Sequence, residues 1–160
     1  YTFQDSADGA FPQSPPIVGP DGNLYGTTYF GGESVCACGT IYKLTLDGIK
    51  TVLHTFQGGK DGANPYGGVL FDKAGVIYGT TEDGGNHCLT HGVACGSVYS
   101  LGTDGSFQTL HVLDGLGDGQ YADSVLTIDS KGYLYGTGSG GGNRNCIQGC
   151  GTVFRLKAKQ

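Results

Sequence analysis

A single stretch of sequence occurs three times in this chain with few changes. It reads GNLYGTTYFGG from residue 22, GVIYGTTEDGG from residue 75 and GYLYGTGSGGG from residue 132. The shared tyrosine is repeated after 53 residues, from Tyr25 to Tyr78, and again after 57 residues, at Tyr135. A period of this size indicates supersecondary units that stack on one another. Because a catalytic site rarely occurs in triplicate, we interpret the repeated stretch as part of a scaffold.

The repeat extends well beyond this stretch. Two further sets of residues keep both spacings: Asp8, Asp61 and Asp118, and Phe3, Phe56 and Leu113. All variation in length falls in one cysteine-bearing loop, and the pattern resumes after it with CGTIYKL, CGSVYSL or CGTVFRL. We therefore treat residues 1–160 as a single repeat domain. Its repeats cover about residues 4–56, 57–113 and 114–160, with residues 1–3 before them.

Each repeat contains short segments that are typical of β-strands and are separated by glycine turns. The first segments read PPIV, GVLF and SVLTI, and the second read NLYGTT, VIYGTT and YLYGTG. The third read GTIYKLTL, GSVYSLG and GTVFRLK, and the fourth, KTVLHTF and FQTLHVL, occur in the first two repeats. No helical period of 3.6 residues is present, so the pattern predicts an all-β fold.

The third segments carry apolar residues on both faces. Tyr42 and Leu44 share one face of their segment, and Ile41 lies on the other. Such a sheet needs cover on both sides, which identical neighbouring sheets provide in a β-propeller. We therefore predict a β-propeller-type array of three four-stranded antiparallel blades, of which the last lacks its fourth strand. Residues 1–3, YTF, align with HTF at 54–56, so we interpret them as the stub of a fourth strand.

The chain also resembles a known family. The motifs G-x-LYGTT-x-x-GG, GTVF and F-x-x-x-x-DGA-x-P are similar to the tandem GloVer repeat of secreted and surface-anchored bacterial proteins. The resemblance covers essentially the whole chain. It implies a propeller-like repeat array that is attached to the cell surface in varied ways. It implies no established activity, no catalytic residues and no cofactor.

Three blades are fewer than the roughly four to eight of known propellers. An open stack leaves sheet faces and a strand edge uncovered. Two chains forming a ring would resolve this, as would chains joined end to end into a filament by lending their N-terminal segments as added strands. A longer array of which this sequence is a piece is the third solution. We expect the chain to bind copies of itself, in a structural or adhesive role without enzymatic activity.

The cysteines occur as one pair in each repeat. The pairs are Cys36 and Cys38, Cys88 and Cys95, and Cys146 and Cys150. A local disulfide in each blade is the favoured interpretation, and it indicates an oxidising, secreted or cell-surface location. The alternative is zinc, because His87 and His91 flank Cys88 and, with Cys95, offer two nitrogen and two sulfur ligands. The other repeats keep both cysteines but lack these histidines.

The repeated aspartates allow two interpretations. Asp8, Asp61 and Asp118 lie in acidic, glycine-containing loops of a kind that can bind Ca²⁺. The favoured alternative is a turn in which each aspartate binds nearby backbone. His54 and His111 share their repeat position with Tyr1. A site that accepts both residue types suggests packed, hydrogen-bonded rings rather than a general base.

Glycan binding is the second interpretation of the array. Aromatic side chains between blades can stack on sugars, and the candidates here are Phe11, Tyr29, Tyr66 and Tyr121. These aromatics are not repeated faithfully, whereas one sugar site per repeat should be regular. The net charge of −5 and the absence of Lys/Arg runs argue against nucleic acid as a partner. No apolar stretch approaches the ~20 residues of a membrane span.

Overall fold

The computed structural model describes residues 1–85, 95–115, 117–143, 145–147 and 149–158. These residues form three antiparallel sheets and two short 3₁₀ turns, η1 (Ser6–Asp8) and η2 (Gly59–Asp61). No helix in the described ranges is long and apolar enough to cross a membrane.

Each predicted repeat contributes one sheet, in which consecutive strands are neighbours. Sheet 1 contains β1 (Ile17–Val18), β2 (Leu24–Thr28), β3 (Thr40–Leu44) and β4 (Lys50–Thr55). Sheet 2 contains β5 (Val69–Phe71), β6 (Ile77–Thr81), β7 (Ser97–Leu101) and β8 (Phe107–Val112). Sheet 3 contains β9 (Thr127–Ile128), β10 (Tyr133–Gly138) and β11 (Thr152–Lys157).

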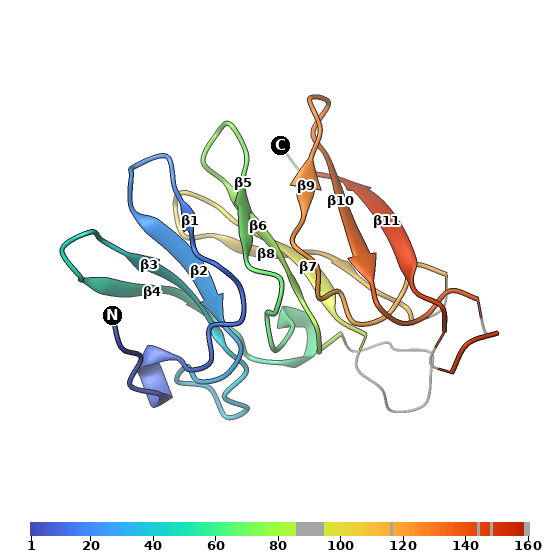
Figure 1. Ribbon diagram of the computed structural model, residues 1–160, viewed down its shortest axis with the longest axis horizontal. Helices are drawn as coiled ribbons and strands as arrows, with labels where there is room; N and C mark the ends of the chain where they lie inside the picture. The colour runs from blue at the N-terminus through green and yellow to red at the C-terminus, as the bar shows by residue number, and fades with distance from the viewer. Residues whose placement is uncertain (86–94, 116, 144, 148, 159–160) are drawn as a thin grey trace.

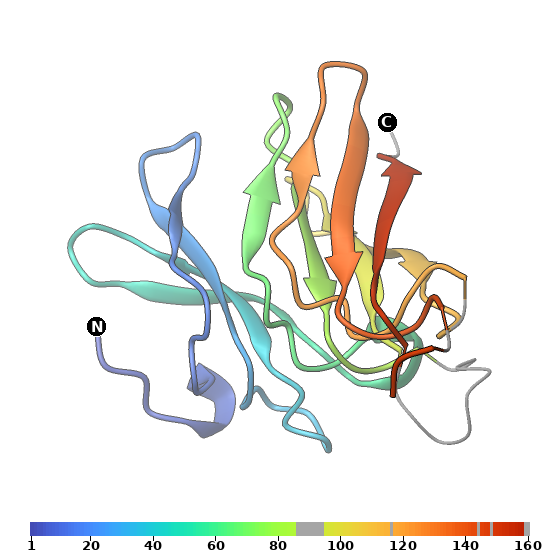
Figure 2. The same cartoon turned by 45° about the vertical axis from the view of Figure 1, so that its right-hand side comes forward.

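The three sheets stand side by side in chain order, as blades of an open stack (Figures 1 and 2). The predicted all-β array with an incomplete last blade is therefore confirmed. Strand β11 is the counterpart of β3 and β7, and it lies at the edge of sheet 3. In sheets 1 and 2 a further strand, β4 or β8, pairs beyond that position. The stub at residues 1–3 lies in no strand of the described chain, although Phe3 packs edge-on against Tyr42 of sheet 1 at 5.2 Å between ring centroids.

The repeated tyrosine is anchored by the first hairpin of each sheet. The hydroxyl of Tyr25 donates to Asp21 at 3.0 Å, that of Tyr78 to Asp72 at 3.2 Å, and that of Tyr135 to Asp129 at 2.9 Å. These aspartates also accept backbone N–H groups of their own turns, as at Asn23, Val76 and Tyr133. One carboxylate thus fixes both the turn and the ring packed behind it.

The glycine after each repeated tyrosine makes room for an aromatic ring. Rings of the third strands lie over these glycines: Tyr42 over Gly26, Tyr99 over Gly79 and Phe154 over Gly136. The sequence predicts such a close approach from a glycine inside a strand. The ring of Tyr99 is fully buried, so the space left by the missing Cβ is filled.

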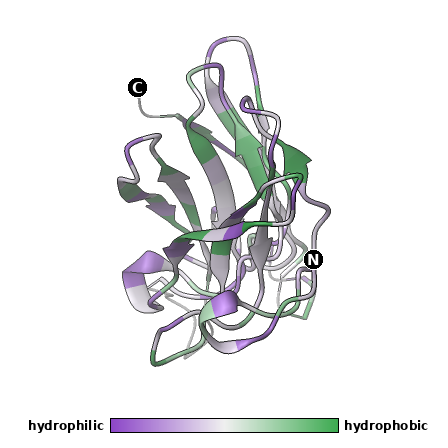
Figure 3. Ribbon diagram, turned by 90° about the vertical axis from the view of Figure 1, so that its left-hand side faces the viewer, coloured by the Kyte–Doolittle hydropathy of each residue, from purple (hydrophilic) through white to green (hydrophobic). Residues whose placement is uncertain are grey.

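The core lies between the sheets rather than within one of them. Tyr25 and Ile41 of sheet 1 pack with Val69 and Tyr99 of sheet 2. Between sheets 2 and 3, Val98 packs with residues that include Leu126 and Leu134. Hydrophobic residues follow the strands and polar residues gather at the turns (Figure 3). Each sheet is therefore stabilised mainly by its neighbour, as two-sided apolar strands require.

We predict that Gly79→Ala lowers the free energy of unfolding by about 1–3 kcal/mol, because the added Cβ overlaps the buried Tyr99 ring in a packed core. Urea unfolding followed by circular dichroism measures this difference. Gly117→Ala is the matched control, since nothing lies within 4 Å of the added Cβ there and the backbone does not need glycine. Equal stability of the two variants would contradict the ring-over-glycine packing.

Candidate functional site

The repeated aspartates occupy one structural position in all three repeats. Each accepts the backbone N–H four residues earlier: Gln4 to Asp8 at 2.7 Å, Gln57 to Asp61 at 2.6 Å, and Asp114 to Asp118 at 2.7 Å. Each also bonds the ring seven residues earlier: the Tyr1 hydroxyl at 2.6 Å, His54 Nε2 at 3.2 Å, and His111 Nε2. Each of the three rings that the sequence predicts to be hydrogen-bonded is therefore bonded to the repeated aspartate of its own repeat.

The fourth strand covers this position in the first two sheets. Lys50 of β4 donates to the Asp8 carboxylate at 3.0 Å, and its side chain is only 2% exposed. Phe107 of β8 stacks on His54 with ring centroids 3.8 Å apart. His111 has no fourth strand of sheet 3 to cover it, and its side chain is 46% exposed against 18% for His54.

The calcium interpretation of these loops gains no support from their geometry. The three carboxylates already accept backbone, tyrosine or histidine donors, as the turn interpretation requires. Within the described residues, no three His, Cys, Asp or Glu side chains gather as they would around a metal ion. The carboxylates act as local braces for the segment that leads into each sheet.

The disulfide interpretation agrees with the described cysteines. Cys36 and Cys38 are bonded, as are Cys146 and Cys150, with Cα atoms 5.1 and 5.2 Å apart. Cys95 is also disulfide-bonded, and its predicted partner Cys88 lies outside the described residues. His87 and His91, the nitrogen ligands of the zinc alternative, lie outside them too.

Three of the four sugar-stacking candidates gather at one end of sheets 1 and 2. Tyr29 contacts Tyr66 edge-on at 6.0 Å and Phe30 at 4.6 Å, and Phe30 contacts Phe11 at 5.7 Å. Burial and a hydrogen bond to the Glu82 carboxylate raise the pKa of Tyr29 to about 12. We call Phe11, Tyr29, Phe30 and Tyr66 the aromatic cluster. No ring contact joins Tyr121 to it within the described chain.

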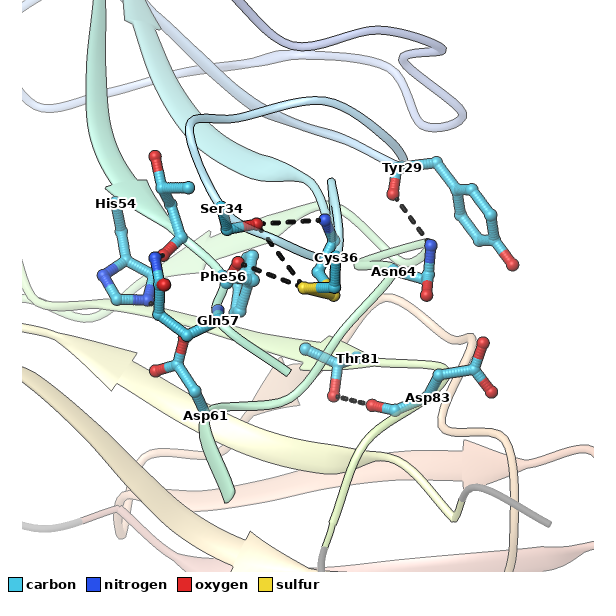
Figure 4. Close-up of a disulfide and its surroundings, with 12 residues drawn as sticks. Tyr29, Ser34, Cys36, His54, Phe56, Gln57, Asp61, Asn64, Thr81 and Asp83 are labelled. Atoms are coloured by element: carbon cyan, nitrogen blue, oxygen red, sulfur yellow. Dashed lines mark hydrogen bonds and ion pairs between the residues drawn. A yellow bond between two sulfur atoms is a disulfide. The ribbon is translucent and has the colours of Figure 1, made fainter. Parts of the chain in front are cut away.

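Tyr121 instead belongs to the junction between sheets 2 and 3. Its backbone N–H donates to the carbonyl of Cys95 at 3.1 Å. At the junction of sheets 1 and 2, the N–H of Asn64 donates to the carbonyl of Cys38 at 2.8 Å. The Asn64 amide also donates to the Tyr29 carbonyl at 3.1 Å, beside the disulfide of Cys36 (Figure 4). The disulfide loops of the first two repeats thus each receive a backbone donor from the next repeat.

Sheet 3 has an uncovered face where sheets 1 and 2 have buried ones. Ile41, Val98 and Val153 share a repeat position, and their exposed fractions are 0%, 0% and 79%. Ile41 is covered by sheet 2 and Val98 by sheet 3. Val153 borders an open hollow that is also lined by Thr137 and Cys150. We call this surface the open face of sheet 3 and take it as the candidate functional site.

Sequence reasoning predicted an uncovered sheet face and a free strand edge, but it did not name the residues that form them. Val153 aligns with Ile41 and Val98, so the repeat alone could have identified it as a core residue without a neighbour. Lys50 and Phe107 gave no signal, because one repeat position carries a cation in one copy and an aromatic ring in the next. Their contacts come from the fold.

The Asp8 brace predicts a pH dependence of stability. Burial opposes ionisation of Asp8, but hydrogen bonds from Tyr1, Gln4 and Lys50 outweigh it and lower the carboxyl pKa. The stabilisation is present above the unfolded pKa of about 3.9 and is lost as the pH falls through the lower folded value. We expect Asp8→Asn to lower the thermal midpoint by a few degrees near neutral pH, and the difference from wild type to shrink as the pH falls below the unfolded pKa of about 3.9.

Thermal unfolding followed by circular dichroism across this pH range measures the effect. Asp47→Asn, at an exposed turn residue, is the control and should follow the wild-type curve throughout. A gap between Asp8→Asn and wild type that stays constant down to the lowest pH would contradict the assignment.

The comparisons with known proteins agree with this architecture. A sequence model of the Gloeobacter/Verrucomicrobia repeat matches residues 12–160. No curated protein matches the chain. The match spans all three sheets and the disulfide loops between their strands. The chain therefore belongs to the Gloeobacter/Verrucomicrobia repeat family.

Proposed function

We propose that this protein is a structural repeat module that binds further copies of itself through the open face of sheet 3. The observation that carries the proposal is Val153, exposed by 79% where both of its repeat counterparts are fully buried. Burial of one valine side chain contributes roughly 1.5–3 kcal/mol. A blade that lay on this face as sheet 2 lies on sheet 1 would recover that free energy.

The edge of sheet 3 supports the same proposal. Among the described residues, strand β11 pairs with β10 alone, whereas β3 and β7 each pair on both sides. An open edge strand presents unpaired backbone N–H and C=O groups that a strand from another chain can bind. Assembly through the face and the edge together gives a ring or a filament, depending on whether the rotation between copies closes.

A structural role outside the cell is consistent with the remaining chemistry. The disulfides favour an oxidising, secreted or cell-surface location. The most conspicuous polar residues, the repeated aspartates and their ring partners, are engaged in bracing the repeats. We therefore propose a non-enzymatic role, adhesive or structural, that needs no cofactor.

We predict that the wild-type chain self-associates at micromolar concentration and that Val153→Asp weakens this association about tenfold or more, because a carboxylate cannot be buried there without a partner. Sedimentation velocity over a concentration series measures both. Val35→Asp, at a fully exposed valine in the first disulfide loop, is the matched control and should associate as wild type does. A folded wild-type protein that stays monomeric across the series would refute the proposal.

The aromatic cluster favours glycan binding as a second candidate function. Phe11, Phe30 and Tyr66 are each more than 40% exposed. The Glu82 carboxylate is hydrogen-bonded to Tyr29, the fourth member of the cluster. Exposed rings next to a hydrogen-bonding carboxylate are a common way to hold a sugar, with the ring stacking on its apolar face.

If this candidate is correct, a glycan array gives a signal above background that Tyr66→Ala removes while the fold is retained. Tyr133→Ala is the aromatic control, because Tyr133 faces Arg155 and Lys157 in sheet 3, away from the cluster. A wild-type array without signal would eliminate glycan binding and leave the assembly proposal untouched.

A further inference from the structure

Each internal junction is closed by a two-residue segment at the same repeat position, which we call the bridge. At the first junction the bridge is Asn64–Pro65, and at the second it is Tyr121–Ala122. The first bridge residue has a positive φ in both cases, 57° and 52°, and donates its N–H to the carbonyl of the preceding repeat's second cysteine. The second bridge residue is buried, Ala122 completely.

The bridge fills a space that glycine leaves open next to each disulfide. A Cβ added at Gly39 would lie 2.7 Å from Cδ of Pro65, and one at Gly96 would lie 3.2 Å from the N atom of Ala122. Gly151 is the counterpart in sheet 3, and the nearest atoms there belong to sheet 3 itself. A hollow of about 350 Å³ opens here, lined in part by Cys150, Gly151 and Val153.

A third bridge lies at the opposite end of the molecule. Phe11–Pro12 has the same repeat position, and Phe11 has the same positive φ of 57°. Its conformation is held as in the other bridges, since the Phe11 carbonyl accepts the N–H of Tyr29 at 2.9 Å, as Asn64 accepts that of Glu82 at 3.0 Å. Yet Phe11 is 63% exposed, Pro12 is exposed, and the Phe11 N–H donates to no backbone carbonyl of the described chain.

We propose that the Phe11–Pro12 bridge of one copy docks into the hollow beside Cys150 of another, with the Phe11 N–H donating to the Cys150 carbonyl. This inference rests on the proposed self-assembly and deepens it by identifying the segment that occupies the open face. The donor and the acceptor are both unmatched in the described chain, and the same pair is matched at each internal junction.

A second pair of backbone groups fits the same docking. The N–H of Phe56 donates to the Gly39 carbonyl at 3.0 Å, and that of Leu113 to the Gly96 carbonyl at 3.1 Å. The corresponding groups are the N–H of Phe3 at one end of the molecule and the carbonyl of Gly151 at the other. In the strand pairings of sheets 1 and 2, Ile41 is opposite His54 and Val98 is opposite His111. Since Tyr1 has the same repeat position as these histidines, the same register places Tyr1 of the docked copy opposite Val153.

The assembly is therefore head to tail, with a surface that differs on the two partners. Residues 1–12 of one copy form the inserted half, and β11 with the hollow forms the receiving half. A heterologous contact of this kind propagates from copy to copy until the chain of copies closes or ends. Each new junction repeats the two junctions already present within the chain.

Photo-cross-linking tests the docking directly. Benzoylphenylalanine placed at position 11 should cross-link to residues 149–153 of a second copy, as identified by mass spectrometry of the dimer band. The same probe at position 66, which has no place in the docking, is the control and should give no cross-link to that segment. Associated chains whose position-11 cross-links fall elsewhere would overturn the docking but leave self-assembly standing.

A charge substitution gives an independent readout. Pro12→Arg should weaken association about tenfold or more in sedimentation velocity. The counterparts of Pro12 are buried at both internal junctions, so docking would bury the added charge. Gln13→Arg adds the same charge one residue away, at an exposed position, and should leave association unchanged. Equal association of both variants would overturn the docking, whereas a monomeric wild type would overturn the proposed function and the docking together.

Discussion

The structure depends on one constraint, which is that each sheet carries apolar side chains on both faces. A sheet of this kind cannot be stable alone in water, because burying one face leaves the other exposed. Ile41 and Val98 show the solution, since each is completely buried by the sheet of the following repeat. Each sheet therefore depends on a neighbour, and Val153 marks a face of sheet 3 that no neighbour covers in the described chain.

Polar contacts fix the positions of the segments between which the apolar side chains pack. The Asp8-type braces fix the segment entering each sheet, and the Asp21-type turns fix the repeated tyrosines. The bridges then set the spacing between sheets through single backbone hydrogen bonds to the disulfide loops. These bonds are individually modest, at roughly 0.5–1.5 kcal/mol each, but they are directional and recur in the same place. They select one arrangement among the many that hydrophobic burial alone would allow.

The sequence was sufficient to predict the blades because the information is periodic. Strand alternation, the glycine under each ring and the missing fourth strand of sheet 3 could all be inferred by aligning the chain with itself. The contacts of Lys50 and Phe107 could not, since they depend on which side chains meet across strands. Phe11 stands out as a sugar-stacking candidate because aromatic residue type is visible in a sequence. Its positive φ, shared with Asn64 and Tyr121, appears only in three dimensions.

The disulfide loops lie at one end of the blades, and they are the segments in which the repeats differ in length. Lengthening such a loop costs little, because closure entropy rises only slowly with the number of residues. The disulfides Cys36–Cys38 and Cys146–Cys150 each join two residues of the loop, at sequence separations of 2 and 4. Changes in these loops can therefore alter the shape and chemistry of one end of the molecule while the sheets stay unchanged.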